Sequence, residues 1–587
     1  MSATPDVIDW IRSAAIPLAT AEPRSGCADL EPLRAVIGDA RIVSLGEATH
    51  GTREFFTLKH RLIEFCVGEL GFTMLIMEAN FAETLAVNDY VLHGIGTAAD
   101  AVARLRWWPW DTQEVVDVVE WLRGWNAGHA RKVKFYGYDI ADPPAATLGL
   151  VDYLDRVAPA LAAVGRATLA PLVSDLTAGL FAKALPARHA EMLAGIGRLR
   201  EAFAQNRAAW SAATSALDWH LGRLHATVLA QSVRFVADRM SALHERAVAE
   251  NVSALLEAEG PDAKAIIWAH NDHVARASFP DGDDPLGSHL DAMFGRAQVV
   301  IGFSFDRGAF QARDFPSGAL ADHRVTAAPP ETFEAALAQA GLPLFCLDLA
   351  HASGEGPVTA WLASEMPMRS IGGIFGLPEG NEYGVSYTRA IIPRCCFDAV
   401  VFVAETTAAR RNRERWSAGA APALAAPTNL ELAGEGVPTG WRLVGAEHGC
   451  ALGARDECAP SGARALRLSR AAGAPRWGDV RLVQKISARP WHGRRVRFAA
   501  ALRTEADRLG GALLLVQLIA NGEGAGSDLY AHEIALATSS DQPMRSPSWT
   551  RAAVEADVPE EAAALVIGLV MTGIGAVWFG DVELASI

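Results

Sequence analysis

Short apolar runs alternate with helical patterns over residues 41–410, and this alternation constrains the fold more than any other feature of the sequence. Most of the runs lack the polar–apolar alternation of a half-exposed strand, which is typical of strands covered on both faces. Because helical segments separate them, the sequence predicts an α/β fold, with βαβ units around a mainly parallel sheet flanked by helices. The strand candidates are residues 41–45, 73–77, 133–138, 265–269, 299–303, 344–349 and 399–403.

Two helices that connect these strands have clear start or stop signals. Thr52 can cap the start of the first, and Gly71 follows its last turn, where a left-handed residue commonly lies. The second is expected to begin at Asp111, with Glu114 three residues on as its capping-box partner.

The length and texture of the chain indicate more than one domain. A single hydrophobic core stops growing near about 250–300 residues, and this chain has 587. Residues 145–258 are rich in Ala, Leu, Arg and Glu without a strand-like run, which predicts a large helical insertion. Small residues at 418–428 indicate a linker. We therefore expect an α/β domain over 1–417 that contains the helical lobe, and an accessory domain over 429–587.

The accessory domain has the pattern of a β-sandwich. Short alternating runs are separated by Gly, Pro and Asp turns, which is typical of antiparallel sheets packed face to face and suggests a jelly-roll-like arrangement. The clearest runs are residues 480–486, 495–502, 512–518 and 576–584.

Charge and composition exclude several classes of partner. A net charge of −15 and an isoelectric point of about 5.6 argue against a nucleic-acid partner, since such proteins carry clustered Lys and Arg. The first residues lack the basic start and apolar run of a secretory signal, so we do not expect secretion by that route. No stretch of about 18 uncharged apolar residues occurs, so we expect no membrane-spanning helix. Seven cysteines without a C-x-x-C pair favour reduced thiols in the cytoplasm, although Cys450 and Cys458 leave one disulfide open. The oligomeric state is not indicated.

Acids and imidazoles follow four of the predicted strands. They are Glu47 and His50 after the first strand, Glu78, Asp139, and the His270-Asn271-Asp272-His273 segment. In parallel sheets, ligands bind beyond the carboxyl ends of the strands, so these groups are expected to meet at one edge. Burying them unpaired would cost several kcal/mol, so we expect them to pair with each other or with substrate. A histidine held by a carboxylate is a competent general base near neutral pH.

Two other chemistries have to be weighed at this edge. The expected set has the right ligand types for zinc or a similar divalent ion, although no H-E-x-x-H motif occurs, and a metal stays open. No G-x-S-x-G nucleophile elbow is present, so attack by water is favoured over a serine acyl-enzyme. The possible metal ligands are Glu47, His50, Glu78, His270 and His273.

Several sequence blocks resemble the erythromycin esterase family. The segment at 44–56, Ser-Leu-Gly-Glu-Ala-Thr-His-Gly-Thr-Arg-Glu-Phe-Phe, resembles the opening motif of that family. The resemblance extends over about residues 30–410, and it departs at His244 and Glu245, which stand where the family pattern usually has an Arg-Asp pair. The further blocks, in the order of the family, are residues 77–81, 108–111, 121–126, 136–139 and 268–274.

The resemblance implies hydrolytic opening of a macrolide lactone or of another ester. His50 would activate water. Glu47 and Glu78 would orient the His50 ring and favour its charged form. His270 and His273 would bind or polarise the substrate carbonyl.

A second group of residues would support this chemistry. Arg53 would help to stabilise the oxyanion. Asp139 is expected to orient other groups, or to be a structural strand-end aspartate. Trp108 and Trp110 would form a wall of an apolar pocket, with core packing as the alternative. Two further residues are placed with this substrate-binding or supporting group: Asn271 and Asp111.

Two alternative functions remain open at this stage. The same scaffold could act as a tailoring enzyme on an amide or a different ester in a peptide or other natural product, because function lives in the site and not in the fold. The chain could also be a binding protein whose β-sandwich recognises carbohydrate or another partner while the first domain is degenerate. For the leading function the expected partner is a small-molecule ester or a macrolide-like substrate.

Overall fold

The computed structural model divides into two compact units, residues 1–140 with 239–418 and residues 141–238 with 419–587. The linker predicted at 418–428 lies outside the described residues. The structure describes residues 3–587 except 174–177, 179–181, 183–185, 239–240, 316–318, 353–355, 378–386, 413–436, 439, 446–449, 472–478, 507–509, 521–532 and 541–542.

The first unit is built on a ten-stranded sheet whose order is β1-β8-β12-β6-β2-β5-β3-β4, with β7 and β10 paired to β6. The six strands from β12 to β4 run parallel, whereas β8 is antiparallel to β12 and β1 to β8. All seven predicted strands are present, which confirms the predicted α/β fold. The strands are β1 (Ala15–Pro17), β2 (Ile42–Leu45), β3 (Met74–Asn80), β4 (Lys134–Asp139), β5 (Ala265–Trp268), β6 (Gln298–Asp314), β7 (Leu320–Val325), β8 (Leu344–Asp348), β10 (Ile374–Phe375) and β12 (Ala399–Thr406).

The strand β6 is much longer than the predicted run at 299–303. Its first half pairs with β2 and β12 inside the sheet, and its second half forms an antiparallel hairpin with β7. Separately, β9 (Met366–Arg369) and β11 (Thr388–Ile391) form a two-stranded antiparallel sheet.

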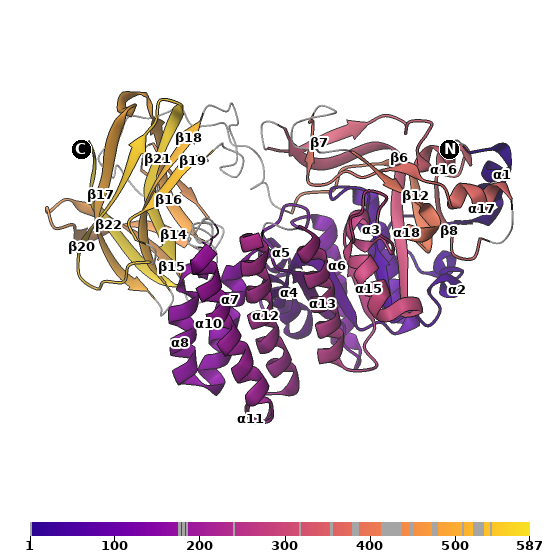
Figure 1. Cartoon of the computed structure of the whole chain (residues 1–587), viewed down its shortest axis with the longest axis horizontal. Coiled ribbons are helices and arrows are strands. Elements are labelled where there is room, and N and C mark those ends of the chain that lie inside the picture. Colours follow the sequence, from indigo (N-terminus) through magenta and orange to yellow (C-terminus); the bar gives the residue numbers. More distant parts are fainter. Residues whose placement is uncertain are drawn as a thin grey trace. The chain divides into compact units, whose positions relative to one another are not determined.

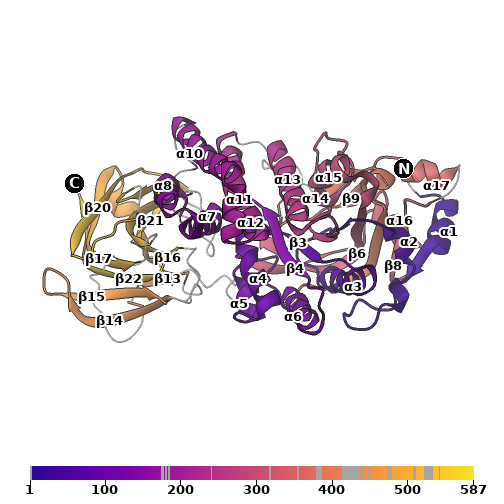
Figure 2. The same cartoon turned by 90° about the horizontal axis from the view of Figure 1, so that it is seen from below.

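Helices cover both faces of the large sheet (Figure 2). One face carries α3 (Arg53–Leu70), α4 (Phe81–His93) and α6 (Gln113–Gly128), and the other carries α13 (Ser241–Glu259) and α15 (Leu286–Phe294). The remaining helices of this unit are α1 (Pro5–Ala14), α2 (Leu33–Ile37), α5 (Ala98–Ala103), α14 (Asn271–Val274), α16 (Phe333–Gln339), α17 (Pro357–Leu362) and α18 (Pro393–Cys396), with short 3-10 turns η1 (Ala28–Leu30) and η3 (Gly295–Ala297).

The helix signals are only partly as predicted. Gly71 ends α3 in the left-handed conformation as expected. The side chain of Thr52 makes no cap bond to this helix and pairs with the Thr49 hydroxyl, 2.7 Å away. The α6 cap is Thr112, not Asp111, because the Thr112 hydroxyl accepts from the Val115 N–H.

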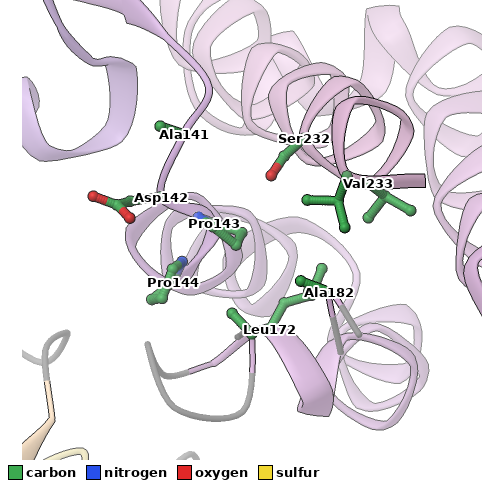
Figure 3. A pocket seen from close by; sticks show the side chains of 10 residues that line it. Ala141, Asp142, Pro143, Pro144, Leu172, Ala182, Ser232 and Val233 are labelled. Carbon is green, nitrogen blue, oxygen red and sulfur yellow. The ribbon is translucent and has the colours of Figure 1, made fainter. Parts of the chain in front are cut away.

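The described residues of 141–238, the first part of the second unit, are mainly helical, and α7, α8, α10 and α12 lie side by side (Figure 1). A pocket of about 210 Å³ opens among α7, α12 and the turn at Leu172, lined by Pro143, Pro144, Ser232 and Val233 (Figure 3). The helix α13, which is inside the predicted insertion, belongs to the first unit. The elements are α7 (Pro143–Val157), α8 (Pro159–Leu169), η2 (Ala170–Leu172), α10 (Pro186–Gln205), α11 (Arg207–Ala213) and α12 (Ala216–Asp238).

The C-terminal region forms two five-stranded antiparallel sheets, β13-β16-β21-β18-β19 and β14-β15-β22-β17-β20 (Figure 1). Side chains from both sheets share one buried core, which includes Leu482, Leu514 and Phe579, so the predicted β-sandwich is confirmed. The strands are β13 (Trp441–Val444), β14 (Cys450–Cys458), β15 (Arg464–Arg470), β16 (Val480–Ser487), β17 (Arg494–Ala506), β18 (Gly511–Ala520), β19 (Glu533–Thr538), β20 (Thr550–Val558), β21 (Ala562–Thr572) and β22 (Gly575–Ser586), with the turn η6 (Arg489–Trp491).

All seven cysteines are free thiols, including Cys450 and Cys458, which the sequence left open as a pair. Among the described helices, none combines the length and apolarity needed to cross a bilayer.

Candidate active site

The four strand-end segments predicted to meet do so, because β2, β5, β3 and β4 are consecutive neighbours in the sheet. The loop after β2 carries Glu47 and His50, and the short helix after β5 carries His270 and His273. These two loops are joined through the backbone, since the Asn271 N–H donates to the Glu47 carbonyl over 2.8 Å. The edge of the sheet therefore holds both loops in a fixed relationship.

Glu47 is fully buried and orients His50. One carboxylate oxygen of Glu47 lies 2.9 Å from His50 Nδ1, and the other accepts from Trp268 Nε1 over 3.1 Å. Burial alone would lower the pKa of His50, but the nearby Glu78 and Glu47 carboxylates outweigh it and raise that pKa above its ordinary value. With Nδ1 held by Glu47, Nε2 is the nitrogen left to accept a proton.

Lys59 is a buried member of this group that the sequence reasoning missed. Its ammonium donates to the second oxygen of Glu47 over 2.6 Å and to the Ala269 carbonyl over 3.3 Å. Burial lowers the pKa of Lys59 to about 8 against the opposing effect of Glu47. Burial alone would raise the pKa of Glu47, yet Lys59 and His50 together lower it. The only sequence signal was a lysine inside the apolar pattern of the first connecting helix.

Glu78, on β3, contacts the segment that follows β5. One of its oxygens accepts from the His270 backbone N–H over 2.8 Å, and the other lies 3.4 Å from His273 Nε2. Burial would raise the pKa of Glu78, but His273 and His50 lower it to about 2. Glu78 is therefore ionised at neutral pH.

His270 has the opposite character to His50. Its Nδ1 accepts from the Asp272 backbone N–H, 3.2 Å away, and burial lowers its pKa. The ring is therefore neutral and carries its proton on Nε2. That nitrogen is buried without a hydrogen-bond partner among the described residues, so it is a donor available to a ligand.

His273 lies between two carboxylates. Its Nε2 faces Glu78, and its Nδ1 lies 3.0 Å from both oxygens of Glu245 at the start of α13. Burial would lower the pKa of His273, but Glu78 and Glu245 raise it well above its ordinary value. Its side chain is 28% exposed against 14% for His50, so both rings are reachable from outside.

Asp139 is buried at the end of β4 and contacts none of the three histidines of the predicted set directly. Its Oδ1 accepts from the Ile140 N–H over 2.6 Å and lies 2.9 Å from His244 Nε2. The adjacent Tyr138 has a buried hydroxyl with no partner in the described part of the chain, and sequence reasoning passed it over.

Of the aromatic residues in the 107–110 segment, Trp110 packs against the His50 ring. Trp110 is fully buried, and its ring meets that of His50 edge to face at 5.8 Å between centroids. The His270 ring lies 5.0 Å from His50 on a tilt of 49°. Trp108 is buried beside Gly373.

Three residues expected to bind or support substrate make other contacts. The Arg53 guanidinium pairs with Glu22 over 2.9 Å. Asn271 clamps the backbone of Phe303 on β6, donating to its carbonyl and accepting from its N–H. Asp111 accepts from the Asn412 amide over 2.8 Å.

Residues in the described part of the chain do not form a group of three or more His, Cys, Asp or Glu side chains placed to hold a metal ion. The carboxylate oxygens of Glu47 are both taken by the donors of Lys59, Trp268 and His50.

The arrangement brings a base, a neutral donor and a cation to one sheet edge. His50 can take a proton through Nε2, His270 can donate through its free N–H, and His273 carries positive charge. This is the set needed to activate water and to stabilise an oxyanion.

A family model described as erythromycin esterase matches residues 67–406. This range contains Glu78, Asp139, His270 and His273 but begins after Glu47 and His50.

Two curated proteins match shorter segments. Erythromycin esterase type II of Escherichia coli is 37% identical over 132 residues, which is 22% of this chain and 31% of that protein. The putative hydrolase YbfO of Bacillus subtilis strain 168 is 32% identical over 114 residues, which is 19% of this chain and 25% of that protein. The chain thus matches about a third or less of the length of these relatives.

Solved structures share the fold. A protein from Bacillus cereus has 24% identity and a TM-score of 0.62, covering 70% of this chain and 99% of its own. A mutant erythromycin esterase in its open conformation has 17% identity and a TM-score of 0.52, covering 66% of this chain and 96% of its own.

Proposed function

This chain belongs to the erythromycin esterase family, and on that premise we propose that it hydrolyses an ester, with a macrolide lactone as its substrate class. In this proposal water attacks the ester carbonyl directly, and His50 is the general base. One observation carries it: His50 is held through Nδ1 by the buried Glu47, 5.0 Å from the ring of His270, whose N–H has no partner among the described residues.

The proposed reaction follows from the protonation states of the three rings. His50 Nε2 takes a proton from water while the water oxygen bonds to the carbonyl carbon. Negative charge then develops on the carbonyl oxygen, where the His270 N–H and the His273 cation stabilise it. When the carbon–oxygen bond of the ester breaks, His50 returns the proton to the leaving alkoxide. The products are a carboxylic acid and an alcohol, which in a macrolide are the two ends of the opened ring.

Two features support the roles of Glu47 and Glu78. Glu47 fixes the His50 ring and its tautomer, as a carboxylate does for a histidine base. Glu78 is ionised and stabilises the imidazolium that forms on His50. Arg53 is left out of the mechanism, because its guanidinium pairs with Glu22.

The remaining assignments follow from the same proposal. The substrate partner is a small-molecule ester, and residues 429–587 form an accessory domain of the hydrolase domain at 1–417. Seven free thiols support a cytoplasmic location.

Hydrolysis in ¹⁸O-labelled water tests the function. A macrolide incubated with the protein should gain the mass of one labelled water, with the label in the new carboxyl group. H50A should abolish this product while the fold is retained, whereas H351Q, a change at an exposed histidine paired with Asp348, should not. Unchanged macrolide with the wild-type protein, or full turnover by H50A, would refute the proposal.

A further inference from the structure

A continuous chain of five titratable side chains leads from the site to the end of β4. It runs Glu78, His273, Glu245, His244 and Asp139, with alternating carboxylates and imidazoles. The closest approaches along it are 3.4, 3.0, 3.0 and 2.9 Å. Three members, Glu245, His244 and Asp139, have no part in the proposed mechanism, and the first two come from the first turns of α13.

The geometry fixes the protonation of both imidazoles in this chain. Each ring nitrogen of His273 faces a carboxylate oxygen, Glu78 on one side and Glu245 on the other. Each ring nitrogen of His244 does the same, toward Glu245 and Asp139. An ionised carboxylate only accepts hydrogen bonds, so a ring between two of them must donate from both nitrogens. Both rings are therefore imidazolium cations.

Glu245 is held in place from several directions. It accepts from His273, from His244 and from the Leu286 backbone N–H over 2.9 Å. Burial would raise the pKa of Glu245, but His273 and His244 lower it strongly. The helix that carries it is fixed to β4, since the buried Asn251 amide donates to the Tyr138 carbonyl over 3.0 Å. This carboxylate is thus a rigid negative charge beside His273.

We propose that Glu245 and His244 are positioning residues that keep His273 doubly protonated, so that His273 serves the site as a fixed cation and not as a second base. The assignment rests on the proposed function for its catalytic meaning. The three histidines then have different roles: His50 is the base, His270 is the neutral donor and His273 is the cation.

This role has a consequence for the base itself. The groups that face His273 are Glu78 from β3, Glu245 from α13 and His50 from the loop after β2. The positive charge of His273 opposes protonation of His50, whose pKa it lowers against the raising effect of Glu78 and Glu47. Loss of the His273 cation should therefore raise the pKa of His50 and move the acidic limb of activity to higher pH.

Nitrogen NMR of histidine-labelled full-length protein tests the proposal without any need for turnover. The His273 signals are assigned from their loss in H273Q. In the wild type both ring nitrogens should have imidazolium shifts at pH 8. In E245Q the midpoint of His273 should fall by about one pH unit or more, because one of two opposing charges is gone. E250Q is the matched control on the same helix, since Glu250 pairs only with the exposed Arg246 in the described structure.

The outcomes separate this inference from the proposed function. A neutral His273 at pH 8 in the wild type overturns it even when E245Q fails to fold, and so does an E245Q titration equal to that of the wild type. If macrolide hydrolysis is absent but His273 behaves as expected, the proposed function fails and the positioning role stands. With an active enzyme, H273Q, which removes the cation, should also shift the acidic limb of kcat/KM upward, and E250Q should leave it in place.

Discussion

The imidazole rings of His50 and His270 lie 5.0 Å apart, yet their surroundings shift the two pKa values in opposite directions. Burial lowers the pKa of His270, whose Nδ1 lies 3.7 Å from a carboxylate oxygen of Asp272. His50 is hydrogen-bonded to Glu47, and the negative charge of Glu78 also acts on it, so its pKa rises. Two neighbouring histidines with separated pKa values can act as base and donor at the same pH, which one histidine alone cannot do.

The pH dependence of hydrolysis is expected to report the raised pKa of His50. A base acts only when it is unprotonated, so kcat/KM should fall as pH drops through a value above 6.5. In E78Q burial still lowers that pKa but the charge of Glu78, the largest single effect that raises it, is gone, so the acidic limb should move down by about one pH unit. The profile is measured for both proteins with one macrolide. A limb that stays in place, or moves up, would contradict the assigned role of Glu78.

His270 is expected to contribute as a hydrogen-bond donor in the transition state. H270F keeps a ring of similar shape but removes the N–H, so kcat should fall about 100- to 1000-fold with little change in KM. H270Q retains an N–H donor and should recover part of this loss. Steady-state kinetics on the two variants and the wild type provide the measurement, and equal kcat values for H270F and the wild type would exclude the donor role.

The sheet and the strand-end cluster were predictable because both depend on local patterns. Apolar runs such as residues 265–269 mark buried strands, and the carboxyl ends of neighbouring parallel strands must meet. That rule alone brings Glu78 to His270, far away in sequence. The prediction needs no side-chain detail, only the order in which strands pair.

The residues that the prediction missed reach the site from helices. Lys59 lies on the apolar face of α3. The sequence pattern does not indicate whether a lysine at such a position points into the protein or toward solvent. His244 and Glu245 lie on α13, whose register over β4 depends on packing that no sequence period specifies. Arg53 was assigned from its place beside the His50 motif, but its partner Glu22 comes from a segment with no strand or helix signal.

The buried pair of Lys59 and Glu47 should show strong coupling in stability. K59M leaves the Glu47 charge buried with weaker compensation, which should destabilise the protein by about 3–5 kcal/mol. In the double variant E47Q/K59M no uncompensated charge remains, so its loss of stability should be smaller than the sum of the two single losses. Urea unfolding of the four proteins at pH 7 provides the cycle. Additive losses would mean that the two groups do not depend on each other.

Gly46 is expected to be irreplaceable because the Asn271 side chain occupies the space of a Cβ. A methyl group at position 46 would lie 2.1 Å from Asn271 Oδ1, the atom that accepts from the Phe303 N–H. G46A must therefore shift either the loop that carries Glu47 or the Asn271 side chain that is hydrogen-bonded to the Phe303 backbone. We expect a cost of about 1–3 kcal/mol. Because the same loop ends in the proposed base, hydrolysis should be impaired as well.

A second glycine provides the control for this substitution. A Cβ at Gly124, inside α6, meets nothing within 4 Å, so G124A should stabilise the protein by about 0.5–1 kcal/mol through its helix preference. Thermal unfolding midpoints and initial rates are compared for the two variants. Wild-type stability and rate in G46A would show that the Asn271 side chain can move away at little cost. The close contact of Gly46 with Asn271 would then not fix the two strand-end loops relative to each other.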